Sequence, residues 1–102
     1  MRKLPPGVEL SGDLTIRGIK IAHERLSLAL RDNSQVEVRV AEDATVDLTL
    51  VQLIEAARRE KRDAGGDLTF ATPAPQPLLD VLTRGGFLEA AESRRFWLGA
   101  GE

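Results

Sequence analysis

A carboxylate and a hydroxyl stand two residues apart in the segment Asp47-Leu48-Thr49, directly before an amphipathic stretch. Asp is a preferred N-cap, so Thr49 falls in the first turn of the predicted helix, where unpaired N–H groups and the macrodipole favour negative charge. A phosphate ester on Thr49 would be stabilised there. The segment has two interpretations: a helix cap beside an ordinary hydroxyl, or a phosphorylation site.

Other residue patterns that carry catalysis or bind cofactors are missing from the sequence. The chain has no cysteine and a single histidine, His23, which leaves no thiolate nucleophile and few ligands for zinc. Gly65-Gly66 follows a predicted helix, whereas the glycine loops that bind phosphate follow a strand. We therefore expect a protein that is not an enzyme and holds no cofactor and no metal.

Length and charge restrict the class of protein further. A chain of 102 residues predicts one domain, which we place at residues 8–98 between a flexible N-terminus (1–7) and a loose C-terminus (99–102). The net charge of −2 argues against a nucleic-acid partner. The apolar runs are too short for membrane insertion and the N-terminus lacks the apolar region of a signal peptide, so we expect a cytoplasmic protein.

The first elements are predicted from hydrophobic periodicity. Val8, Leu10, Leu14 and Ile16 keep a period of two that Gly12 interrupts, which indicates a bent strand. Residues 17–31 have the spacing of a helix whose inward stripe is Ile19, Ala22, Leu26, Ala29 and Leu30.

Two apolar residues of that helix fall on its other side. Ile21 and Leu28 are seven residues apart and are predicted to be exposed. Isolated exposed apolar residues are common, so the pair is either unremarkable or a contact in a weak homodimer or with a partner.

The middle of the chain predicts a second strand and a second helix. Val36, Val38 and Val40 alternate with polar residues, which is typical of a strand with one wet face or a place near a sheet edge. Residues 48–64 form a helix with Leu50, Leu53, Ile54 and Ala57 inward. On its outward side Glu55 precedes Arg59 by four residues, the spacing of a surface ion pair.

After Gly65-Gly66 the sequence predicts a third strand, a proline-rich loop and a short helix. Pro77 suits the first turn of that helix, and Gly85-Gly86 ends it. The tail holds the single Trp97, which either closes the core or belongs to an added edge strand. Strands alternating with helices predict an α/β fold with right-handed crossovers and a parallel or mixed sheet.

From Val8 to Leu88 the order of these elements resembles the STAS family, the domains of sulfate transporters and anti-sigma factor antagonists. The matching segments are Leu10-Ser11-Gly12-Asp13-Leu14, then Asp47-Leu48-Thr49-Leu50-Val51, the Gly65-Gly66 turn, and the short helix ending at Gly85-Gly86. The resemblance implies a small mixed, largely parallel β-sheet with helices predominantly on one side. Many family members carry a further strand before this first one, and here that edge is short or missing.

The resemblance also implies a function. In the anti-sigma antagonists one end of the sheet binds a kinase of the Ser/Thr type that is also an anti-sigma factor, and phosphorylation of the second hydroxyl of an Asp-Ser/Thr-Ser/Thr-Gly signature releases it. Position by position, Asp47 matches the acid and Thr49 the phosphoacceptor. The implied partner-binding residues are Asp13, Thr15, Arg17, Asp47, Leu48, Thr49, Thr72 and Gln76.

Two residues depart from the family pattern. Leu48 stands in place of the first hydroxyl and Leu50 in place of the glycine, where bulk hinders the approach of ATP. The expected function is therefore a stand-alone signalling adaptor for an anti-sigma or sensor kinase, regulated at Thr49. The alternative is a non-phosphorylated structural subunit, like the STAS component of lipid-transport ABC complexes.

Overall fold

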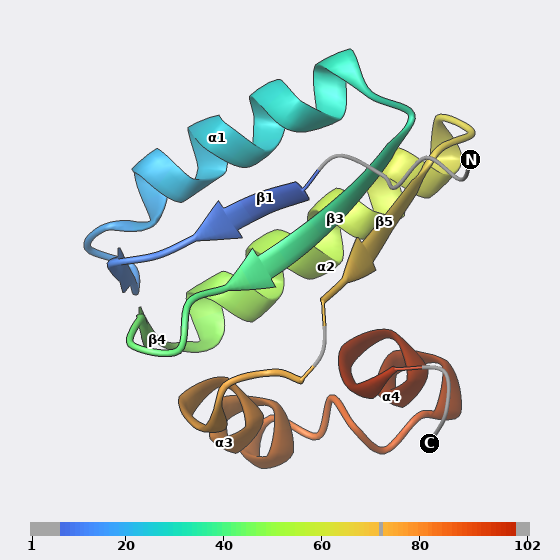
Figure 1. Ribbon diagram of the computed structural model, residues 1–102. Coiled ribbons are helices and arrows are strands. Elements are labelled where there is room, and N and C mark those ends of the chain that lie inside the picture. Colours follow the sequence, from blue (N-terminus) through green and yellow to red (C-terminus); the bar gives the residue numbers. More distant parts are fainter. Residues whose placement is uncertain (1–6, 72, 100–102) are drawn as a thin grey trace.

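The computed structural model describes residues 7–71 and 73–99 (Figure 1). Three parallel strands form the main sheet in the order β1-β3-β5, with β1 at Gly7–Leu10, β3 at Gln35–Val40 and β5 at Asp67–Phe70. Gly7, placed in the N-terminal tail by the sequence, is the first residue of β1. A second, two-stranded parallel pair joins β2 (Asp13–Leu14) to β4 (Thr45–Val46). The expected small, largely parallel α/β fold is confirmed.

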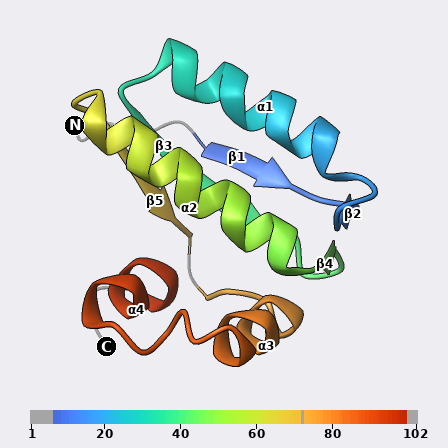
Figure 2. The same cartoon turned by 180° about the vertical axis from the view of Figure 1, so that it is seen from behind.

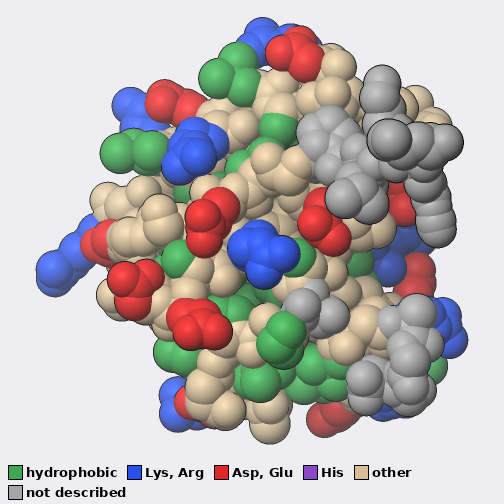
Figure 3. Space-filling model, viewed as in Figure 1, with side chains coloured by type: hydrophobic (Ala, Val, Ile, Leu, Met, Phe, Trp, Pro, Cys, Tyr) green, Lys and Arg blue, Asp and Glu red, His purple; other side chains and the backbone are tan. Residues whose placement is uncertain are grey.

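Helices α1 (Ile19–Asp32) and α2 (Leu48–Asp63) cover the same face of the sheet (Figure 2). Their apolar stripes pack on the inward side chains of the strands, so that Leu26, Val38 and Ile54 are almost inaccessible to solvent. Leu53, predicted to point inward with Ile54, is half-buried beside the groove between the two helices. The opposite face of the sheet carries acidic and basic side chains instead (Figure 3).

The strand that contains Val36, Val38 and Val40 was predicted either to have one wet face or to lie near a sheet edge. Strand β3 lies between β1 and β5, at the centre of the sheet and away from its edges. Its alternation arises because one face packs on the helices, which buries Val36, Val38 and Val40, while Arg39 is exposed on the uncovered face. The wet face is confirmed, and the edge position is wrong.

The first strand is shorter than its periodicity suggests. Gly12 has a positive φ of 80° and separates β1 from β2, as the predicted bend requires. Beyond Leu14 the chain turns and Ile16 is 74% exposed, so the predicted extension of the strand to Ile16 is wrong. The turn forms because the Asp13 carboxylate accepts hydrogen bonds from both the N–H and the hydroxyl of Thr15.

The C-terminal part lies along the β5 side of the sheet. Helix α3 (Gln76–Arg84) begins with Pro77 in its first turn and ends at Gly85, as predicted, and α4 (Ala91–Leu98) follows. Trp97 on α4 is fully buried, which confirms that the tail closes the core, and it does so as a helix and not as a strand. The Trp97 indole lies 5.1 Å from the Phe70 ring, centroid to centroid.

Glu55 accepts a hydrogen bond from the buried Trp97 indole. The Nε1–H of Trp97 donates to Glu55 Oε2 at 2.9 Å, which satisfies the one polar group of the indole. The other Glu55 oxygen lies 3.8 Å from Arg58. The predicted surface pair with Arg59 is therefore replaced by the pair with Arg58, because Glu55 turns toward α4.

Candidate functional site

The two short strands bring together the segments that the sequence singled out. Asp13 pairs with Thr45 and Leu14 with Val46 in parallel register. Parallel strands send the chain out at the same edge of the sheet, so the turn after β2 and the start of α2 after β4 are neighbours. We call residues 13–18 and 47–49 the loop cluster.

Asp47 holds the two segments of the loop cluster together. Its Oδ1 accepts the N–H of Thr49 at 2.8 Å, which is the predicted N-cap of α2. Its Oδ2 accepts the N–H of Ile16 at 3.2 Å, from the turn that precedes α1. One carboxylate thus accepts a hydrogen bond from an otherwise unpaired N–H at a helix start. It also fixes a loop 31 residues earlier in the chain.

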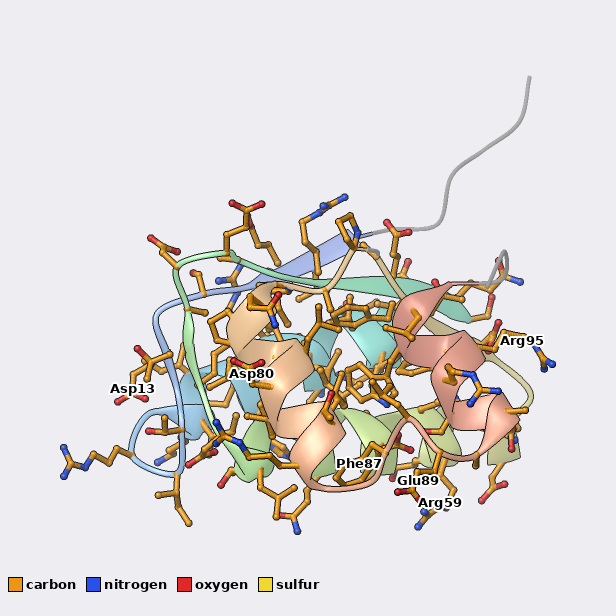
Figure 4. The ribbon with its side chains drawn as sticks, turned by 90° about the horizontal axis from the view of Figure 1, so that it is seen from below. Asp13, Arg59, Asp80, Phe87, Glu89 and Arg95 are labelled. Atoms are coloured by element: carbon orange, nitrogen blue, oxygen red, sulfur yellow. The ribbon has the colours of Figure 1, made fainter. Side chains whose placement is uncertain are left out.

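Asp13 and Thr15 build the turn that Asp47 anchors. The hydrogen bonds from the side chain and backbone of Thr15 lower the pKa of the Asp13 carboxyl below its ordinary value of 3.8, and Arg17 adds a smaller electrostatic effect. The N–H of Gly18 donates to the Thr15 carbonyl at 3.0 Å and closes the turn. Asp13 lies at the outer end of the molecule and points away from its body (Figure 4).

Gly18 is required by close packing within this turn. A Cβ at this position would collide with the carbonyl oxygen and the Cβ of Asp13. The obstacle includes backbone, which cannot move aside as a flexible side chain would. The close packing of the residue before α1 against β2 therefore requires glycine at position 18.

Thr49 lies at the rim of a groove between the two helices. The groove has a volume of about 460 Å³ and is lined by Ile19, Lys20, His23, Thr49, Gln52 and Leu53. We call it the α1–α2 groove. Thr49 is half-buried, and its backbone is fixed by Asp47. Thr49 therefore has a fixed backbone and shares this groove with two basic residues of α1, Lys20 and His23.

Two apolar side chains of the loop cluster are exposed to solvent. Ile16 is 74% exposed and Leu48 is 45% exposed. Leu48 belongs to the predicted contact residues, whereas Ile16 does not, because the alternating pattern assigns it to a strand. The signal that identifies it is the Asp-x-Thr spacing at residues 13–15, which favours a turn over a longer strand.

Six of the eight predicted contact residues lie in the loop cluster, and Gln76 does not. The cluster contains Asp13, Thr15, Arg17, Asp47, Leu48 and Thr49. Gln76 is the first residue of α3, where its amide donates to Asp80 at 3.0 Å. Among the described residues no hydrogen bond joins it to the cluster. Thr72 lies outside the described residues.

The remaining side chains offer little for metal binding. Within residues 7–71 and 73–99 no three His, Asp or Glu side chains gather as metal ligands would. None of the helices in that part of the chain has the length and apolar character needed to cross a bilayer.

Among known proteins, no family model matches the chain, and no curated protein and no solved structure matches it.

Proposed function

We propose that the protein is a STAS-type signalling adaptor that binds a kinase-like partner, an anti-sigma factor of the Ser/Thr kinase type or a sensor kinase. The binding surface is the loop cluster, including its two exposed apolar side chains, Ile16 and Leu48. The observation that carries the proposal is the double use of Asp47, which supports a preformed surface by fixing the Ile16 turn and the Thr49 backbone at once. A preformed surface loses little conformational entropy on binding.

Thr49 is the regulatory residue of this proposal. The partner's kinase activity would transfer the γ-phosphoryl group of ATP to Thr49 Oγ1, forming a new P–O bond, breaking the bond to the leaving ADP and releasing the hydroxyl proton. The product carries roughly two negative charges at pH 7. Placed beside apolar Ile16 and Leu48 in a partner interface, these charges weaken binding through desolvation and repulsion.

A second candidate function is supported by the same exposed apolar side chains. Leu48 occupies the first hydroxyl position of the family signature and is 45% exposed, as a constitutive apolar contact requires. In this candidate the protein is a structural subunit that binds the ATPase of a lipid-transport-type ABC complex and is not phosphorylated. The two functions differ in whether charge at Thr49 controls binding.

A binding titration separates the two functions. The partner is recovered by affinity purification and then titrated, as a pure protein, against wild type, Thr49→Glu and Thr49→Ala. The regulated adaptor predicts a loss of affinity of at least about tenfold, or 1.4 kcal/mol, for Thr49→Glu alone. Intact-mass analysis after incubation with the partner and ATP reports phosphorylation directly.

The matched control for the charge is Thr69→Glu. Thr69 is an exposed threonine of β5 on the uncovered face of the sheet, far in sequence from the loop cluster. Equal affinities of all four proteins, with no added phosphate, would reject regulation at Thr49 and favour the structural subunit. Equal losses for Thr49→Glu and Thr69→Glu would assign the effect to overall charge.

A further inference from the structure

The lining of the α1–α2 groove is unusual for a surface with as many acidic residues as this one. Four of its six residues are uncharged at any pH, and the two titratable ones, Lys20 and His23, are both basic. No carboxylate lines it within the described part of the chain. The groove therefore combines the Lys20 ammonium and two further hydrogen-bond donors, His23 and Gln52, with the apolar side chains of Ile19 and Leu53.

The donors of the groove come from both helices and line it together with Thr49. Lys20 and His23 are three residues apart on α1, the spacing that places side chains on one side of a helix. Gln52 is three residues after Thr49 on α2 and lines the same groove. An ammonium, an imidazole and an amide thus share the groove with the Thr49 side chain.

The carboxylate that caps α2 does not compete for these donors. Asp47 precedes Thr49 by two residues, and its two oxygens already accept the N–H groups of Thr49 and Ile16. Its charge acts on the groove from the start of α2 without occupying Lys20 or His23. A newly added anion on Thr49 would find the Lys20 ammonium and the His23 imidazole in the same groove.

We propose that the α1–α2 groove is a binding site for a phosphate monoester carried by Thr49, with Lys20, His23 and Gln52 donating to its oxygens. The inference rests on the proposed function only for the choice of Thr49 as phosphoacceptor. It adds that the phosphate is held by the chain itself and ties α1 to α2. Phosphorylation then changes the surface by linking two helices as well as by adding charge.

The experiment uses the full chain with phosphothreonine incorporated at position 49 during synthesis, so that no kinase is needed. The pH titration of its ³¹P resonance gives the pKa of the second phosphate ionisation, which is about 6 for an unperturbed phosphothreonine. Cations within reach favour the dianion and lower this pKa. We expect the double variant Lys20→Met, His23→Gln to raise it by at least about 0.5 unit over the phosphorylated wild type.

The control variant is Arg25→Met. Arg25 is an exposed basic residue of the same helix, but it lines a different pocket, on the side of α1 that faces Ser11 and Asp13. All variants retain Asp47 and the start of α2, so contributions from the helix terminus and from that carboxylate cancel in the comparison. Circular dichroism verifies that each variant is folded.

Two results would overturn the inference. The phosphate pKa could be the same in wild type and in the double variant, or Arg25→Met could raise it as much as the double variant does. Both results leave the proposed function open, since that depends on partner affinity. Conversely, a pKa that depends on Lys20 and His23 together with unchanged partner affinity of Thr49→Glu would support the phosphate site and reject the proposed regulation.

Discussion

The carboxylate of Asp47 accepts the backbone N–H of Ile16 at 3.2 Å while its other oxygen caps α2 through Thr49 at 2.8 Å. The two contacts make the start of α2 and the turn before α1 one structural unit. A substitution at Asp47 therefore affects two segments, one of which carries the exposed Ile16 side chain. The capping contact alone would affect only the start of α2.

Replacing Asp47 should lower the stability of the domain. We expect Asp47→Ala to reduce the free energy of unfolding by about 1–2 kcal/mol, since it removes a helix cap and a second hydrogen bond. Asp47→Asn should lose less, because asparagine caps helices nearly as well as aspartate. Urea denaturation measures both, and partner titration should show weaker binding for Asp47→Ala.

The control for this prediction is Asp63→Ala. Asp63 is an exposed residue in the last turn of the same helix, where a negative charge is unfavourable to the macrodipole. We expect its replacement to leave stability unchanged or slightly raised. A stability for Asp47→Ala equal to that of wild type would show that neither hydrogen bond contributes.

Gly18 should resist even the smallest substitution. We expect Gly18→Ala to cost about 1–3 kcal/mol, because the new methyl group collides with the Asp13 backbone and strains the turn. Gly7→Ala is the matched control, since a Cβ there would meet only the Glu37 carbonyl at 3.9 Å, an ordinary contact. Similar urea midpoints for the two variants would contradict the close approach at Gly18.

The lowered pKa of Asp13 predicts a local effect of pH. Because the folded state favours the carboxylate, this contribution to stability is fully present above the ordinary pKa of 3.8 and is lost as the pH falls through the lower folded value. A ¹³C titration of the Asp13 carboxyl should show a midpoint below 3.8 in wild type and in Thr15→Ser. In Thr15→Val, which lacks the hydroxyl donor, we expect the midpoint to move toward 3.8. An unmoved midpoint would assign the shift to the backbone N–H of Thr15 or to Arg17.

The exposed pair on α1 leaves the predicted homodimer open to test. Ile21 is 69% and Leu28 is 53% exposed, as the helical spacing predicted. If the pair is a contact between two copies, sedimentation velocity of the wild type should show a coefficient that rises with concentration, and Ile21→Ser with Leu28→Ser should remove the rise. Arg31→Ser, another exposed position of α1, is the control. A wild type that sediments as a monomer throughout would reject the dimer.

The parts of the fold that the sequence predicted are those with local causes. Asp47 was assigned as the N-cap of α2 because an acid precedes an apolar stripe, and α2 begins at Leu48. Pro77 and Gly85 mark the first turn and the end of α3 for equally local reasons, a fixed φ and a helix-ending glycine. Each of these signals acts within a few residues.

The parts that were missed depend on contacts between distant segments. Ile16 continues the alternation of β1, but its backbone N–H donates to the Asp47 carboxylate, 31 residues later, which holds it in the turn after Leu14. Glu55 has the spacing of a surface ion-pair residue, yet it turns inward to meet Trp97, 42 residues later. The groove residues Lys20 and Gln52 become neighbours only after α1 and α2 pack on the same face of the sheet.

The hydrogen bond between Trp97 and Glu55 gives the protein an intrinsic optical reporter. Trp97 is the single tryptophan of the chain and is fully buried, so all indole fluorescence comes from one site on α4. Emission from a shielded indole lies at shorter wavelength than emission from one in water. Separation of α4 from β5 would therefore appear as a red shift and as faster quenching by iodide. The docking of the last helix can be followed in solution without attaching any label.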